Sequence, residues 1–294
     1  MKKMIFALIL IGVSISATLS QAMAAQQQWP DEIIFGVIPV ASSREMSDSF
    51  GNLTNYLQQE LGIKVKLQVA GDYTAVITGM QHKRVDVAYL GPKSYCEAAK
   101  RAGAEAVAVE VGQDGTPGYY GFIITKAGSG LKDVNALKGK TWAFTDPQST
   151  SGTLVPTIYF NEIHIDPQEY FSKVIYSGSH EASILAVKSG KVAAASTNNL
   201  DYIRGLGKRW QDDDFNIIWK SELIPGSPIA VRKDLPSSLK MAIKGAFISY
   251  ADKDGLEKLK IAGYIPGNDS MYNGIRELIV MKSELKKKAK VAKQ

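Results

Sequence analysis

The chain alternates short apolar segments with amphipathic segments of helical period, and this alternation restricts its fold more than any other feature. In the first third, strand-like segments occur at 32–38, 64–69, 85–89 and 104–111. Helical periodicity separates them at 47–61 and 73–82, and Pro92 opens a further helix, since proline is favoured in the first turn. A strand–helix–strand rhythm predicts a mostly parallel sheet covered by helices on both faces.

A second round of the same rhythm follows. Strands are expected at 140–144, 170–176, 192–196 and 215–219, and helices at 152–163 and 181–188. The turn-rich segment 225–228 then precedes a last apolar strand and more helices. This order predicts an α/β fold of two lobes, with 25–124 and 225–294 in lobe 1 and 125–224 in lobe 2. A ligand would lie in the cleft between the lobes, at the carboxyl ends of strands.

The N-terminus has the pattern of an export signal. Lys2 and Lys3 precede an apolar run over 4–13, and Ala22-Met23-Ala24 is a small-x-small cleavage site. An uncleaved membrane anchor is the alternative, but the run is short for a bilayer and a polar segment follows it. With no cysteine at the cleavage site, we expect 1–24 to be a signal peptide and the rest to be a soluble periplasmic protein.

The charge pattern argues against nucleic acid as a partner. Removal of Lys2 and Lys3 lowers the formal net charge of +6 to +4, and the tail 282–294 carries six lysines and one glutamate. The remaining body therefore has a net charge of −1. A nucleic-acid-binding fold needs a basic stripe on the fold itself, whereas a lysine-rich tail is typical of a solvated helix end.

The segment 146–153, Asp-Pro-Gln-Ser-Thr-Ser-Gly-Thr, is the most informative motif. It joins an expected strand to an expected helix, so Ser149, Thr150 and Ser151 would meet free backbone amides at a helix N-terminus, which is a favourable place for an anion. Gly152 would let the backbone approach a ligand closely. An ordinary helix cap is the alternative, and one hydroxyl would suffice for it.

Two other strand-to-helix junctions carry polar or aromatic side chains. His180 follows the strand that ends near Tyr176, and it could donate to the same anion or merely cap its helix. Tyr73, Tyr89 and Tyr95 flank junctions in the first lobe. Each could pack in the core, or together they could form a cleft wall with polar tips.

These motifs occur in a familiar order. Gly71-Asp72-Tyr73, the segment 86–95, Gly115 to Tyr120, the 146–152 loop, Gly178-Ser179-His180-Glu181 and Trp219 to Pro228 follow one another along nearly the whole mature chain. The chain thus resembles the phosphate, phosphite and phosphonate substrate-binding proteins of ABC transporters. The resemblance implies a two-lobed periplasmic binding protein fold of type II that closes around its ligand, with a membrane permease as partner.

The resemblance also implies ligand roles for particular residues. Ser149, Thr150 and Ser151 would hold the phosphorus-bound oxygens, His180 would assist them, and Tyr73 would be a cleft aromatic. The second cleft aromatic maps to Tyr89 or Tyr95, and the local sequence leaves both open.

One departure from the resemblance bears on the ligand. Relatives that hold aminoalkylphosphonates place acidic residues where this chain has Leu200 and Ser227, although Asp201 is adjacent. The sequence shows no obvious arginine and no secure carboxylate for this pocket. An ammonium group would then be buried without a partner, so we expect phosphite or a short alkylphosphonate to be preferred over an aminated phosphonate.

Other functions are less well supported. The sequence has no GxSxG elbow, P-loop or HExxH motif, and its three histidines and single Cys96 are scattered, which argues against a catalytic or metal site and against a cofactor. A phosphate-ester hydrolase using Ser149 or Ser151 with His180 would need an orienting carboxylate. A ligand-sensing module on the same fold is a second alternative. We expect a monomer.

Overall fold

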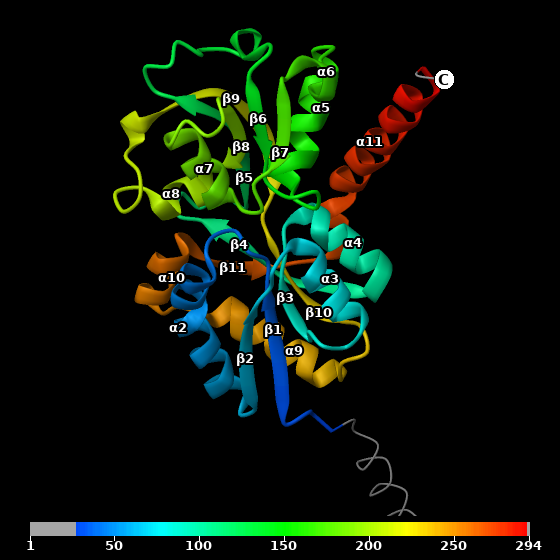
Figure 1. The fold of residues 1–294 in the computed structure, drawn as a ribbon. Coiled ribbons are helices and arrows are strands. Elements are labelled where there is room, and N and C mark those ends of the chain that lie inside the picture. The colour runs from blue at the N-terminus through cyan, green and yellow to red at the C-terminus, as the bar shows by residue number, and fades with distance from the viewer. Residues whose placement is uncertain (1–27, 293–294) are drawn as a thin grey trace, which may run out of the picture.

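The computed structural model describes residues 28–292, which form two lobes, each built on its own β-sheet (Figure 1). The strand order is β11-β4-β10-β3-β1-β2 in lobe 1 and β7-β6-β8-β5-β9 in lobe 2. The predicted signal peptide, 1–24, lies outside the described residues. The two-lobed α/β architecture expected from the alternating pattern is confirmed.

Lobe 1 contains the N-terminal and C-terminal parts of the described chain. Its strands are β1 (Glu32–Val37), β2 (Lys64–Val69), β3 (Val87–Tyr89), β4 (Ala104–Gly112), β10 (Pro228–Arg232) and β11 (Ile261–Pro266). Its helices are α2 (Ser43–Leu61), α3 (Tyr73–Gln81), α4 (Pro92–Ala102), α9 (Ser237–Ser249), α10 (Lys253–Leu259), the short η4 (Asp269–Tyr272) and α11 (Asn273–Ala292).

Lobe 2 is formed by the middle of the chain. Its strands are β5 (Gly118–Lys126), β6 (Thr141–Phe144), β7 (Lys173–Tyr176), β8 (Ala194–Asn198) and β9 (Phe215–Pro225). Its helices are α5 (Val155–Glu162), α6 (Pro167–Tyr170), α7 (His180–Lys188) and α8 (Asn199–Gly205), with the short turns η1 (Asn135–Leu137), η2 (Thr150–Leu154) and η3 (Asp212–Asp214). The η2 turn is π-helical and leads directly into α5.

Both sheets are mixed, so the expectation of mostly parallel sheets is only partly right. In lobe 1, β2, β1 and β3 pair in parallel, but β10 runs antiparallel to β3 and β4, and β11 antiparallel to β4. In lobe 2, β6 is parallel to β7 and β8, whereas β5 is antiparallel to β8 and β9. The antiparallel neighbours arise because β10 and β5 are the strands that enter each sheet from the other lobe, without a crossover helix.

The chain passes between the lobes at two adjacent places. The first passage lies at 113–117, since β4 ends at Gly112 and β5 begins at Gly118 in the second sheet. It therefore precedes the boundary expected at 124, because the whole of β5 pairs with β8 and β9. The second passage lies between Pro225 and Pro228, beside the boundary expected at 225. Gly118 pairs with Pro225, which brings the two passages side by side.

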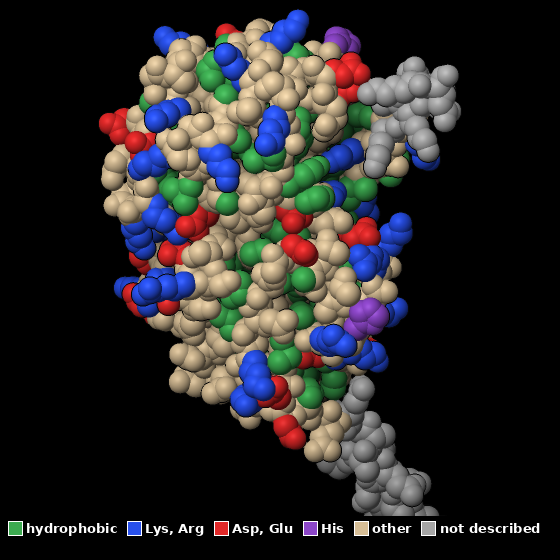
Figure 2. Space-filling view, viewed as in Figure 1, with side chains coloured by type: hydrophobic (Ala, Val, Ile, Leu, Met, Phe, Trp, Pro, Cys, Tyr) green, Lys and Arg blue, Asp and Glu red, His purple; other side chains and the backbone are tan. Residues whose placement is uncertain are grey.

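Aromatic packing stabilises each lobe. In lobe 1, Phe35 makes edge contacts with Phe50 and Phe247, and the predicted apolar stripe of α2 is buried as expected. In lobe 2, Trp142 is fully buried and its ring stacks on that of Phe171. No helix among residues 28–292 has both the length and the apolar character to span a bilayer. On the face seen in Figure 2, basic side chains are interspersed with acidic ones over both lobes.

Candidate functional site

The serine-rich loop after β6 forms one side of an enclosed cavity between the lobes. Ser149 caps η2, since its Oγ accepts a hydrogen bond from Gly152 N at 3.0 Å, and Ser149 and Thr150 line the cavity. Thr150 Oγ1 also accepts from Lys93 N of lobe 1 at 2.9 Å. The loop therefore starts a helical segment, which was the alternative interpretation of the motif. It also forms part of the contact between the lobes.

Ser151 and Gly152 follow in the same loop, and neither of them lines the cavity. Ser151 is buried but does not line the cavity, and its hydroxyl bonds instead to Asn198 Nδ2 at 3.3 Å and to the Tyr119 phenol. A Cβ on Gly152 would lie 2.3 Å from the Thr145 side chain. Glycine is thus required to pack the loop against the end of β6, and Gly152 is not among the residues that line the cavity.

His180 is the first residue of α7, and its imidazole is buried beside the loop. Its Nε2 lies 3.3 Å from Ser149 Oγ and 3.8 Å from Asp201 Oδ2, while Nδ1 faces the hydroxyls of Thr145 and Thr197. Burial lowers the pKa of His180, so the imidazole is neutral near pH 7. Because Nδ1 faces hydroxyls, the Ser149–His180 pair has no carboxylate that would orient it as a nucleophile and base.

Two of the three tyrosines line the cavity, and the third does not. Tyr73 begins α3, and Tyr89 ends β3, where its hydroxyl donates to the Glu110 carboxylate at 3.1 Å. Tyr95 is wrong as a cleft residue: its hydroxyl donates to Asp269 Oδ1 at 2.7 Å, and its ring packs on Tyr272 in lobe 1. It lies one turn into α4, on the face that packs against η4 rather than toward the cavity.

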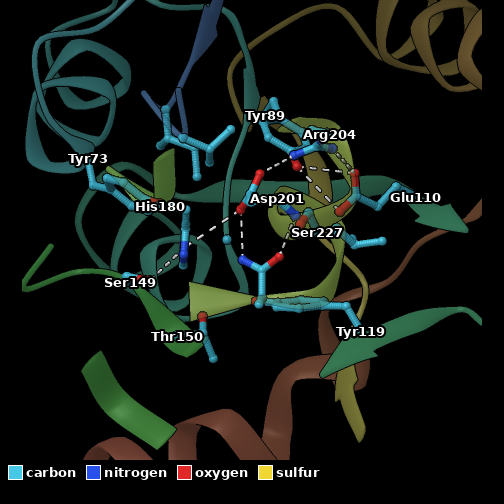
Figure 3. A pocket seen from close by; sticks show the side chains of 15 residues that line it. Tyr73, Tyr89, Glu110, Tyr119, Ser149, Thr150, His180, Asp201, Arg204 and Ser227 are labelled. Carbon is cyan, nitrogen blue, oxygen red and sulfur yellow. Dashed lines mark hydrogen bonds and ion pairs between the residues drawn. The ribbon is translucent and has the colours of Figure 1, made fainter. Parts of the chain in front are cut away.

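A buried charge cluster, which the sequence did not reveal, extends from the middle of the cavity to the wall opposite the serine loop (Figure 3). It consists of Arg204 and Asp201 of α8 together with Glu110 of β4 (Figure 3). Arg204 Nη1 lies 2.6 Å from Asp201 Oδ1, and Nη2 lies 3.7 Å from Glu110 Oε2 in the other lobe. The expectation that this pocket holds no arginine and no secure carboxylate is therefore wrong. The signal was available, since Asn198 to Asp201 is another strand-to-helix junction and Arg204 follows Asp201 by one turn.

Residues of both lobes enclose the cavity. Its lining comprises Ile38, Val40, Tyr73, Tyr89, Gly91, Glu110, Tyr119, Ser149, Thr150, His180, Asn198, Leu200, Asp201, Arg204 and Ser227. The cavity volume is about 20 Å³, room for about one or two water-sized groups. Within residues 28–292, no group of three or more His, Cys, Asp or Glu side chains is arranged to hold a metal ion.

Four helical segments start at this cavity. Tyr73, Thr150 and His180 are the first residues of α3, η2 and α7, and Asn198 is the N-cap of α8. Helix N-termini carry partial positive charge and exposed N–H donors. Their convergence offers an anion a favourable potential.

Polar contacts between the lobes surround the cavity. Glu181 N donates to Val40 O at 3.1 Å, and Glu181 Oε2 accepts from Ser42 N at 2.8 Å. Arg209 lies 2.7 Å from Glu181 Oε1 and 3.6 Å from Glu45 Oε1 of lobe 1. On the other side, Lys93 Nζ donates to Gln148 Oε1 at 2.8 Å. These rim contacts hold the lobes together around the enclosed cavity.

Comparisons with known proteins agree on one family. A family model described as "ABC transporter, phosphonate, periplasmic substrate-binding protein" matches residues 35–272. The phosphonates-binding periplasmic protein of Escherichia coli (strain K12) is 34% identical over 92% of this chain and 81% of its own length. The phosphate-import protein PhnD of Mycolicibacterium smegmatis is 28% identical, covering 85% of each chain.

Solved structures give the same result for the fold. A binding protein component of an ABC phosphonate transporter from Pseudomonas aeruginosa has a TM-score of 0.82 at 32% identity, covering 87% of each chain. PhnD1 of Prochlorococcus marinus, solved in complex with methylphosphonate, has a TM-score of 0.76 at 21% identity, over 85% of this chain and 97% of its own. The second likeness concerns the fold alone.

Proposed function

The chain belongs to the family of periplasmic substrate-binding proteins of phosphonate ABC transporters, and on that premise we propose that the enclosed cavity binds phosphite or a short alkylphosphonate. Membership of the family makes it a periplasmic transport component that delivers ligand to a membrane permease, and not an enzyme.

The observation that carries the ligand assignment is the convergence of helix N-termini on the cavity. An oxyanion placed among Tyr73, Thr150 and His180 would receive hydroxyl donors and amide donors from both lobes. Hydrogen bonds to a charged acceptor are stronger than neutral ones, so a few such donors suffice for tight binding. The neutral His180 can donate through Nε2 while Nδ1 accepts from a neighbouring hydroxyl.

The distal end of the cavity favours a small ligand. Ile38, Val40 and Leu200 offer apolar surface for a hydrogen or a methyl group on phosphorus. The Arg204 cluster also lines the cavity, and Arg204 already pairs with Asp201 and faces Glu110. A longer substituent would have to displace that cluster, and the volume of about 20 Å³ leaves little room to do so.

Calorimetric titration of the mature protein tests this assignment. Phosphite, methylphosphonate, phosphate and 2-aminoethylphosphonate are compared under one buffer condition. We expect phosphite or methylphosphonate to bind at least tenfold more tightly than 2-aminoethylphosphonate, a difference of about 1.4 kcal/mol. Tighter binding of the aminated ligand would contradict the assignment.

Three finer properties belong to the same proposal. We infer that the signal peptide is cleaved after Ala24, because the small-x-small pattern ends there. The mature protein acts as a monomer. It has no nucleic-acid partner, since its body has almost no net charge. Lobe 1 is the segment before the first passage together with the segment after Pro225, and the two passages form the hinge.

A further inference from the structure

The buried charge cluster at the distal wall joins the two lobes. Arg204 and Asp201 belong to α8 of lobe 2, whereas Glu110 belongs to β4 of lobe 1. The exposed fractions of the Arg204 and Glu110 side chains are only 11% and 2%. One guanidinium therefore faces two carboxylates in a place with little water, and the cluster keeps a formal charge of −1.

Each member of the cluster has other fixed partners. Asp201 Oδ2 accepts from Asn198 Nδ2 at 2.7 Å, and the Glu110 carboxylate accepts from Tyr89 OH. Arg204 Nε donates to Leu259 O of lobe 1 at 3.1 Å. Arg204 Nη2 alone lacks a hydrogen-bond partner, and its neighbour is Glu110 Oε2 at 3.7 Å. Both carboxylates thus have hydrogen-bond partners at the cavity wall other than the guanidinium.

The cluster lies across the cavity from the anion-binding side. In Figure 3, Ser149 and Thr150 lie at one side, Arg204 and Glu110 at the other, and Asp201 between them. A ligand whose phosphorus end reaches the serine loop would direct its substituent toward this wall. A substituent with a positive charge would meet the Arg204 guanidinium, which already neutralises one of the two carboxylates.

We propose that Arg204 is a specificity-determining residue: its guanidinium occupies the place of a ligand cation between Asp201 and Glu110, and so excludes phosphonates that carry an amine. The proposal rests on the function proposed above, and it goes further by naming the residue that rejects one ligand class. Without the guanidinium, the two carboxylates would form a cation subsite, because a buried carboxylate without a partner is strongly unfavourable.

Another titratable group close to the cluster, the His180 imidazole, must be kept in one protonation state during a test. His180 Nε2 lies 3.8 Å from Asp201 Oδ2, so a protonated imidazole could replace the guanidinium. Measurements at pH 8 keep the imidazole neutral. Arg204 also ties the lobes together through Leu259 O, so any substitution weakens closure around every ligand. The informative quantity is therefore a ratio of two affinities and not either affinity alone.

Two ligands of equal length supply that ratio. Propylphosphonate and 2-aminoethylphosphonate differ by a terminal methyl against a terminal ammonium, and both can be measured by displacement of methylphosphonate. For Arg204→Met, we expect the affinity ratio to shift at least tenfold toward the aminated ligand, relative to the wild type. Arg204→Lys retains the cation, and its ratio should stay within about threefold of the wild type.

Further variants separate charge from structure. In Arg204→Met combined with Asp201→Asn, the gain for the aminated ligand should largely disappear. Arg209→Met removes a rim arginine outside the cavity and should change both affinities by the same factor. Glu110→Gln, which keeps the arginine, should move the ratio toward propylphosphonate, and it provides a second test if the methionine variant does not fold.

The outcomes are distinguishable. Equal loss of both ligands in Arg204→Met, with an unchanged ratio, would show that Arg204 only bridges the lobes, and the proposal would be wrong. If the wild type binds neither methylphosphonate nor phosphite, the proposed function itself fails, whatever the ratio does.

Discussion

The hydroxyl of Thr150 is the group whose removal tests the site most directly. Its Oγ1 accepts from Lys93 N at 2.9 Å, and its hydroxyl lies beside the Tyr119 phenol at the cavity, where a ligand oxygen could replace the phenol as its partner. Thr150→Val preserves the shape of the side chain and removes both interactions. A hydrogen bond to a charged group contributes about 1.5–3 kcal/mol, so ligand affinity should fall roughly tenfold to hundredfold. The lost contact with Lys93 N should add to this, because it stabilises closure.

Calorimetry with methylphosphonate on the wild type and the variant measures this loss. Thr157→Val is the matched control, because the Thr157 hydroxyl bonds only to Thr153 O on the same helical segment. Its affinity should match the wild type. Circular dichroism and urea unfolding establish that both variants fold. Equal affinities for Thr150→Val and Thr157→Val would refute the reasoning and would reduce the loop to a helix cap with no ligand role.

Two further predictions concern single residues. Tyr95→Phe should leave ligand affinity unchanged and lower the free energy of unfolding by about 1 kcal/mol, since the Tyr95 hydroxyl bonds to Asp269. Tyr89→Phe should weaken ligand binding, because it removes the hydrogen bond that holds Glu110. The reverse pattern would contradict the placement of the two tyrosines. His180 has a folded pKa below its ordinary 6.5, so the unfolded state binds more protons in that window and stability falls as the pH drops through 6.5 toward the folded pKa. Urea unfolding of wild type and His180→Gln between pH 8 and 5 should show their stability difference shrinking as pH falls, and a constant difference would refute this.

Local features of the fold were predictable from the sequence. The predicted strand at 64–69 coincides with β2, and Pro92 does open α4, because periodicity and helix-start preferences are written in neighbouring residues. The antiparallel positions of β10 and β11 were not predictable in the same way. They depend on where the chain re-enters lobe 1, and no short segment encodes that.

The sequence predicted the site residues that stand at helix starts, but not those that are brought together only by the contact between the lobes. Ser149, Thr150 and His180 follow strands directly, and they do line the cavity. Glu110 lies inside a strand among apolar residues, and only tertiary structure brings it to Arg204. The prediction that Tyr95 lies in the cleft was wrong because a position near a helix start does not determine which face of the helix a side chain occupies.

The rim contacts that Glu181, Arg209 and Lys93 each make with the other lobe have a consequence for the rate of transport. The contacts of Glu181 with Ser42, of Arg209 with Glu45 and of Lys93 with Gln148 exist only while the lobes are together, so they lower the free energy of the closed form whether or not ligand is inside. A more populated closed form reduces the cost of closing around a ligand and so increases affinity. The same contacts must break before cargo can leave. Stronger rim contacts would therefore lengthen the time for which each ligand stays bound. Uptake from dilute solution would improve, but ligand would be released to the permease more slowly.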